Sequence, residues 1–125
     1  WPHTMNRILR SLEIVVVDDH APTRAVVGAM LRAAGAVSIR EASDASEALA
    51  LIAERGADLV ITDHAMPGAD GLSLIEALCS APKDRRPRTL LMTGYTDVGP
   101  GKADAVLTKP LDAAALLRAL NEALA

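Results

Sequence analysis

Short apolar runs alternate with segments of helical periodicity along most of this chain, and this alternation limits the folds that it can adopt. The runs are rich in Val, Ile and Leu with little polar alternation, which is typical of strands buried on both faces. Five strands are expected, at Glu13–Val17, Val37–Ala42, Ala57–Asp63, Thr89–Thr93 and Asp104–Pro110. Strands that alternate with helices form a parallel sheet covered by helices on both faces. The sequence therefore predicts an α/β fold.

Helix boundary signals flank most of the segments between these strands. Pro22 suits the first turn of a helix that Gly35 ends, and Val26 and Met30 are expected on its buried face. Later helices are expected to begin at polar caps. The candidate caps are Ser43 or Asp44, Asp70 or Ser73, and Asp112.

The segment between the fourth and fifth strands is the exception to this pattern. Residues Tyr95–Ala103 contain Gly99, Pro100 and Gly101, which interrupt helices. A parallel crossover needs about ten or more residues and usually includes a helix. We therefore expect a loop here in place of the helix found after the other strands.

The composition excludes several classes of function. With 125 residues the chain forms one domain, and with no Phe its core is aliphatic. A net charge of −3 and few aromatic side chains argue against a nucleic-acid partner. No apolar run is long enough to span a membrane. The single cysteine, Cys79, excludes an intrachain disulfide and fits a reducing, cytoplasmic location.

Polar residues interrupt the apolar pattern where four of the strands end. They are Asp18 with Asp19, then Asp63, Thr93 and Lys109. The carboxyl ends of parallel strands meet at one edge of the sheet, so these side chains are expected in one cleft. Clustered carboxylates need a cation to neutralise them, and Mg²⁺ binds through a few carboxylates while sharing its ligand shell with phosphate. The sequence predicts a Mg²⁺ and phosphoryl site.

Asp63 is the best candidate for a nucleophile that forms an aspartyl phosphate. It stands alone at a strand end, and Pro67 and Gly71 shape the loop that follows it. Lys109 is expected to bind a phosphoryl oxygen and Thr93 to donate a hydrogen bond to another. Taken singly, each residue has a simpler interpretation, since an Asp after a strand is often a turn or cap residue.

Four segments together resemble the receiver domain of two-component response regulators. They are "VVVDDH", "VITDHAMPGADG", "LLMTGY" and "VLTKP", and they occur in this order from about Glu13 to the C-terminus. The resemblance implies a doubly wound, flavodoxin-like sheet of five parallel strands in the order 2-1-3-4-5. The Thr-Gly-Tyr sequence and the missing helix further resemble a receiver subgroup with a degenerate fourth helix.

The resemblance also implies roles for individual residues. Asp63 is the phosphoacceptor, and a histidine kinase or a histidine phosphotransfer domain is the donor. Asp19 and Asp63 bind Mg²⁺ directly, Asp18 binds it through water, and the Ala65 carbonyl is a further ligand. Thr93 is the switch hydroxyl and Lys109 binds the phosphoryl group.

Two positions depart from the family pattern. Val106 stands where the family usually has the aromatic ring of its switch. We hypothesise that Tyr95 replaces that ring and that the loop from Thr93 to Ala103 switches on phosphorylation. Ala65 cannot orient a water molecule and Tyr95 could shield the site, so slow self-dephosphorylation is expected.

Other functions stay open at this level. A Mg²⁺-dependent phosphohydrolase would share the aspartyl-phosphate chemistry, and a pseudo-receiver would bind partners without being phosphorylated. The leading interpretation is a signalling domain that is not an enzyme, present as a monomer or weak dimer. Residues 1–12 are expected to be a leader or linker segment, and residues 13–125 the receiver domain.

Overall fold

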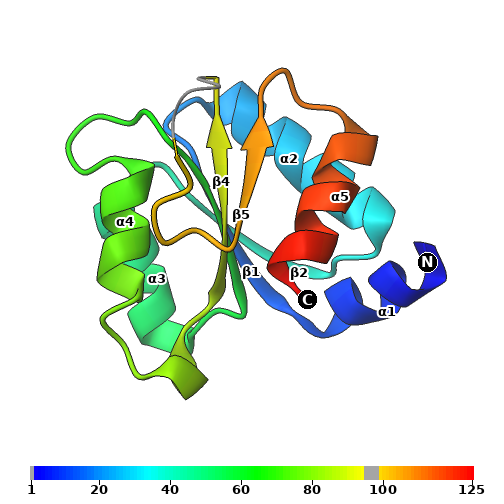
Figure 1. Cartoon of the computed structure of the whole chain (residues 1–125), viewed down its shortest axis with the longest axis horizontal. Helices are drawn as coiled ribbons and strands as arrows, with labels where there is room; N and C mark the ends of the chain where they lie inside the picture. Colours follow the sequence, from blue (N-terminus) through cyan, green and yellow to red (C-terminus); the bar gives the residue numbers. More distant parts are fainter. Residues whose placement is uncertain (1, 95–98) are drawn as a thin grey trace.

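A five-stranded parallel sheet with helices on both faces forms the centre of the fold (Figure 1). The structure is a computed structural model that describes residues 2–94 and 99–125. The strand order is β2-β1-β3-β4-β5, which confirms the predicted doubly wound topology. The strands are β1 Glu13–Val17, β2 Ser38–Ala42, β3 Leu59–Asp63, β4 Arg88–Thr93 and β5 Ala105–Thr108.

The helices divide between the two faces of the sheet. Figure 1 shows α3 and α4 on one side and α1, α2 and α5 on the other. They are α1 Pro2–Ser11, α2 Ala21–Ala34, α3 Ala45–Arg55, α4 Gly71–Leu78 and α5 Ala113–Ala123, with a short 3₁₀ turn at Lys83–Arg85. Of the candidate caps, Asp44, Asp70 and Asp112 accept a hydrogen bond from a backbone N–H in the first turn of α3, α4 and α5.

Successive residues of β1, an interior strand of the sheet, belong to two separate apolar cores. Ile14 and Val16 of β1 belong to the core beneath α1, α2 and α5. Val15 and Val17 belong to the smaller core beneath α3 and α4. This division follows from the two-residue period of side chains along a strand, and it explains why β1 contains no polar residue between Ile14 and Val17.

The prediction of the buried face of α2 is wrong for Val26, which is 47% exposed. Met30 is half-buried and packs against the core as expected, but Val27 and Leu31 are fully buried. Val26 with Met30 and Val27 with Leu31 are both apolar pairs at four-residue spacing, so the sequence alone permits either face. Contacts with the sheet decide between them.

The segment before β1 forms a helix that the sequence did not predict. Met5 and Leu9 of α1 lie one turn apart, and both are buried against the core beneath α2 and α5. The helix also approaches the end of α2 closely, because a Cβ added at Gly35 would lie 2.6 Å from the Asn6 side chain. Gly35 has a φ of +121°, which a side chain would strain. Residues 2–11 therefore pack as an additional layer of the fold.

The described part of the crossover between β4 and β5, residues 99–104, contains no helix. This agrees with the prediction that a loop replaces a helix between the fourth and fifth strands. Lys102 forms an ion pair with Glu76 of α4, with 3.3 Å between Nζ and Oε1. Tyr95, to which we assigned a possible switch role, lies outside the described residues. In the described part of the chain, no helix has the length and apolar character needed to cross a membrane.

Candidate functional site

Three carboxylates meet at the carboxyl edge of the sheet. Asp18 and Asp19 follow β1, and Asp63 is the last residue of β3, the strand beside it. One carboxylate oxygen from each residue lies within 4.8 Å of the others. Asp18 and Asp63 are buried and Asp19 is exposed. The parallel register thus places these residues together as the sequence predicts.

Asp18 is the least satisfied of the three carboxylates. Its Oδ1 accepts a hydrogen bond of 2.9 Å from the His20 N–H, but its buried Oδ2 has no hydrogen-bond partner among the described residues. Burial raises the pKa of Asp18 above its ordinary value, and the nearby charge of Asp63 raises it further. An ionised, buried oxygen without a donor calls for a cation.

The donor set suits Mg²⁺. Carboxylate oxygens in a small group, one of them exposed to solvent, are the hard ligands that Mg²⁺ binds while it retains several waters. The orphaned Oδ2 of Asp18 shows that the protein itself leaves ligand capacity unused. The residues present therefore fit the metal that the sequence implied.

Lys109 brings a positive charge to the nucleophile candidate. Its Nζ lies 2.7 Å from Oδ1 of Asp63, and the Lys109 backbone N–H donates to the Thr93 carbonyl at 2.8 Å. The ammonium therefore comes from the segment just after β5, and its position depends on the pairing of β5 with β4. The Lys109–Pro110 peptide bond is cis.

A small cleft opens beside this ion pair. It has a volume of about 320 Å³ and is lined by Asp63, His64, Ala65, Thr93, Gly94 and Lys109. Thr93 is buried at the end of β4. The glycine that follows it adds no side chain to the opening, and Ala65 adds only a methyl group. The cleft can admit a compact anion next to the Asp63 carboxylate.

The loop after Asp63 is held by a close backbone approach. The Gly71 N–H donates to the His64 carbonyl at 2.9 Å. A Cβ added at Gly71 would lie 2.1 Å from the Asp63 carbonyl oxygen, so a side chain cannot fit without movement of the backbone. This contact keeps the start of α4 against the end of β3 and fixes the backbone that carries Asp63.

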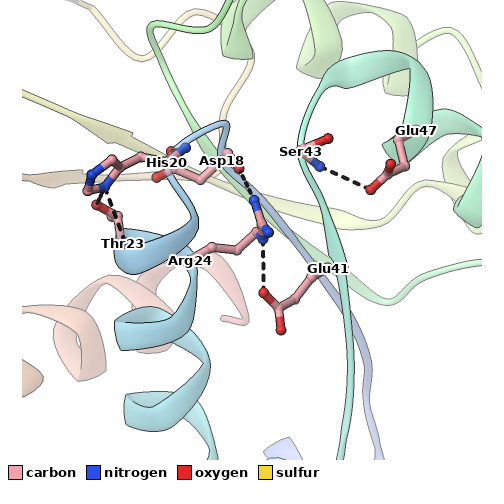
Figure 2. Close-up of polar contacts among 7 residues, drawn as sticks. All are labelled: Asp18, His20, Thr23, Arg24, Glu41, Ser43 and Glu47. Carbon is pink, nitrogen blue, oxygen red and sulfur yellow. Dashed lines mark hydrogen bonds and ion pairs between the residues drawn. The ribbon is translucent and has the colours of Figure 1, made fainter.

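Two residues at the start of α2 contact the acidic cluster in ways that the sequence did not reveal (Figure 2). They are His20 and Arg24. His20 is the N-cap of α2 and accepts from the Thr23 N–H through Nδ1. Arg24 donates to the Asp18 carbonyl at 2.6 Å and to Glu41 at 2.9 Å. A basic residue near a helix N-terminus is unfavourable for the helix dipole, and this was the one available sign that Arg24 has a tertiary role.

Val106 occupies the middle of β5 and is half-buried. It pairs with Leu91 of β4. A branched aliphatic side chain at this position is stiff at χ1 and does not have the reach of an aromatic ring. The switch assigned to Tyr95 and Val106 therefore stays a hypothesis.

Comparison with known proteins shows which family this chain is similar to. The family model for the response regulator receiver domain matches residues 14–121. The chain is 38% identical over 127 aligned positions to the virulence sensor protein BvgS of Bordetella pertussis, covering 92% of this chain and 10% of that protein. It is 26% identical to the chemotaxis protein CheY-3 of Vibrio cholerae, with 90% of this chain and 92% of that protein covered.

A solved structure has the same fold. The response regulator protein TrrA from Thermotoga maritima, in complex with Mg²⁺ and BeF, superposes with a TM-score of 0.78 at 29% identity. The superposition covers 89% of this chain and 97% of that one.

Proposed function

Because this chain belongs to the response regulator receiver family, we propose that it is the phosphoacceptor of a two-component phosphorelay, phosphorylated on Asp63. The observation that carries the proposal is the position of Asp63, buried between two further carboxylates and the Lys109 ammonium at the mouth of a small cleft. Matches to a sensor protein and to a chemotaxis protein support a signalling role.

The proposed reaction is a displacement at phosphorus. An Oδ of Asp63 attacks the phosphoryl group of a phosphohistidine, so that an O–P bond forms as the N–P bond breaks and the donor imidazole leaves with the electron pair. Lys109 neutralises charge that gathers on the phosphoryl oxygens, and its 2.7 Å contact with Asp63 supports this proposed role. Thr93 lines the cleft. Its hydroxyl donates a hydrogen bond to the phosphoryl group, and Thr93 is the proposed switch residue.

Mg²⁺ is the proposed cofactor, and when bound it neutralises the carboxylates and the incoming phosphoryl group. Asp19 and Asp63 are the proposed direct ligands, Asp18 a ligand through water, and Ala65 a ligand through its carbonyl. The complex of TrrA with Mg²⁺ and BeF supports this assignment by analogy.

The proposed partner is a histidine kinase or histidine phosphotransfer domain, and the proposed location is the cytoplasm. We further propose that the domain catalyses only its own phosphorylation and dephosphorylation. Ala65 offers no side chain that could orient water towards the phosphoryl group, so the aspartyl phosphate is expected to hydrolyse slowly.

The deciding experiment is incubation with acetyl phosphate and Mg²⁺, followed by intact-mass analysis. We expect one phosphoryl group on the wild-type protein and none on Asp63→Ala. Asp84→Ala is the matched control, since Asp84 is an exposed carboxylate in the 3₁₀ turn and should leave labelling unchanged. Unlabelled wild type would indicate a pseudo-receiver, and sustained turnover of a phosphomonoester would indicate a phosphohydrolase.

A further inference from the structure

Arg24 joins the acidic cluster to the edge of the sheet. Its Nη1 donates to the carbonyl oxygen of Asp18 at 2.6 Å, and its Nε donates to Oε1 of Glu41 at 2.9 Å. Figure 2 shows the guanidinium lying between the loop after β1 and the strand β2. The Arg24 side chain is 19% exposed, while that of Glu41 is 43% exposed. The bridge is therefore partly shielded from water.

The backbone of Asp18 is also held on its N-terminal side. The Asp18 N–H donates to the Ala42 carbonyl at 3.0 Å, which extends the pairing of β1 with β2 by one residue. The Asp18 carbonyl would have no strand partner beyond this point, and Arg24 takes that place. Both polar groups of the Asp18 backbone are thus hydrogen-bonded, which restricts the backbone that carries the Asp18 and Asp19 side chains.

We propose that Arg24, held by Glu41, is a positioning residue that sets Asp18 and Asp19 in the geometry for binding a divalent cation. The inference rests on the proposed function and adds to it a residue that touches neither the cation nor the phosphoryl group. Arginine suits this role because its planar guanidinium can donate in two directions at once, to a carbonyl and to a carboxylate. A lysine has a single ammonium at the end of a flexible stem and cannot hold both partners in the same way.

An electrostatic role and a positioning role of Arg24 predict opposite changes in Mg²⁺ affinity when the residue is replaced. A cation close to the site repels Mg²⁺, so if charge alone mattered, removing the Arg24 charge would tighten Mg²⁺ binding. If Arg24 positions the ligands, its removal frees the loop and weakens binding. The sign of the change in the Mg²⁺ dissociation constant therefore distinguishes the two effects.

The test is a Mg²⁺ titration of the whole chain, followed through backbone amide shifts by NMR, with no phosphodonor present. Arg24→Met keeps the apolar stem and removes the donors, and we expect binding about tenfold weaker, which corresponds to about 1.4 kcal/mol. Arg24→Lys keeps the charge and should also bind several-fold more weakly. Arg55→Met is the control, because it breaks the comparable ion pair with Glu13 at the other end of β1. That variant should bind Mg²⁺ as the wild type does.

A second pair of variants separates charge from hydrogen bonding at the other end of the bridge. Glu41→Gln and Glu41→Ala remove the same charge, but only the glutamine still offers Arg24 an acceptor. We expect Glu41→Ala to bind Mg²⁺ more weakly than Glu41→Gln. Equal binding by these two variants, or tighter binding by Arg24→Met, or wild-type binding by Arg24→Lys, would overturn the inference.

The titration also separates this inference from the proposed function. Wild-type protein that binds no Mg²⁺ would overturn the proposed cofactor and the role of Arg24 together. Wild-type protein that binds Mg²⁺, with the Arg24 variants unchanged, would overturn only the role of Arg24. Urea unfolding of each variant shows whether it is folded, and Arg24→Lys serves as the test should Arg24→Met not fold.

Discussion

Asp18 shows how a residue of the candidate site can oppose the stability of the fold. Its Oδ2 is buried without a hydrogen-bond partner in the described part of the chain, and burial raises its pKa. A carboxyl whose pKa is raised on folding has an ionised form that the folded state disfavours. At neutral pH the charge of Asp18 therefore reduces the free energy of unfolding of the metal-free protein.

We accordingly predict that Asp18→Asn stabilises the metal-free protein at neutral pH. The amide has nearly the same shape but no charge to desolvate and none to repel Asp63. The melting temperature, measured in EDTA by circular dichroism, should rise by a few degrees. The same variant should lose most of the stabilisation that Mg²⁺ gives to the wild type. A lower melting temperature in EDTA would show that Asp18 is not under electrostatic strain.

Sequence reasoning located the site residues that interrupt an apolar pattern and missed those that do not. Asp63 and Thr93 end apolar strands, so their polarity needs an explanation. His20 and Arg24 lie in or beside the first turn of a polar helix surface, where such residues are common. Each has a backbone group among its partners, the Thr23 N–H for His20 and the Asp18 carbonyl for Arg24, and a backbone partner leaves no mark in the sequence.

At the scale of elements, α1 illustrates the limit of local signals. It has ten residues, lacks an acidic first turn, and is short enough to be marginal as an isolated helix. Its stability comes from the contacts of Met5 and Leu9 with the core beneath α2 and α5. These contacts could not be read from residues 2–11 alone. The absence of a helix from residues 99–104, the described part of the crossover, could be predicted, because Gly99, Pro100 and Gly101 act locally.

We predict that Leu9→Ala lowers the free energy of unfolding by about 3 kcal/mol, the usual range for a fully buried leucine. Ile8→Ala is the control on the same helix, since Ile8 is 37% exposed, and it should cost less than about 1 kcal/mol. Urea unfolding measures both values. Equal, small effects would mean that α1 does not stay packed in solution, and that residues 1–12 act as the linker first expected.

The cap of α4 gives a prediction about pH. The hydrogen bond from the Ser73 N–H lowers the pKa of Asp70 below its ordinary value of 3.8. A carboxyl whose pKa is lowered on folding adds stability above its unfolded pKa, and this stability is lost as the pH falls through the folded value. Asp70→Ala should therefore cost about 1 kcal/mol at pH 7, as for other N-caps. The difference between variant and wild type should shrink below a pH of about 3.8.

That comparison needs a control with an intact cap. Asp70→Asn keeps an oxygen that can accept from the Ser73 N–H but has no charge to lose. Its difference from the wild type should be smaller than that of Asp70→Ala at pH 7. A cost of Asp70→Ala that stays the same from pH 7 to pH 3 would contradict the role of the ionised cap.

At the scale of the whole molecule, the candidate site and α1 lie at opposite ends of the strands. The acidic cluster and Lys109 lie at the carboxyl ends of the strands, whereas α1 leads into the amino end of β1. The strand β1 alone spans roughly 13 Å at about 3.3 Å per residue. Leu9 and Asp18 thus lie beyond opposite ends of the same strand.

This separation predicts that changes at the two ends are independent. The double variant Leu9→Ala with Asp18→Asn should have a change in unfolding free energy equal to the sum of the two single changes, within about 0.5 kcal/mol, as for distant sites without shared partners. Leu9→Ala alone should leave the Mg²⁺ dissociation constant unchanged. Urea unfolding in EDTA and the NMR titration measure the two quantities on the same four proteins. An interaction free energy above about 1 kcal/mol, or weaker Mg²⁺ binding in Leu9→Ala, would show that β1 transmits the packing of α1 to the acidic cluster, and would make α1 part of the switch.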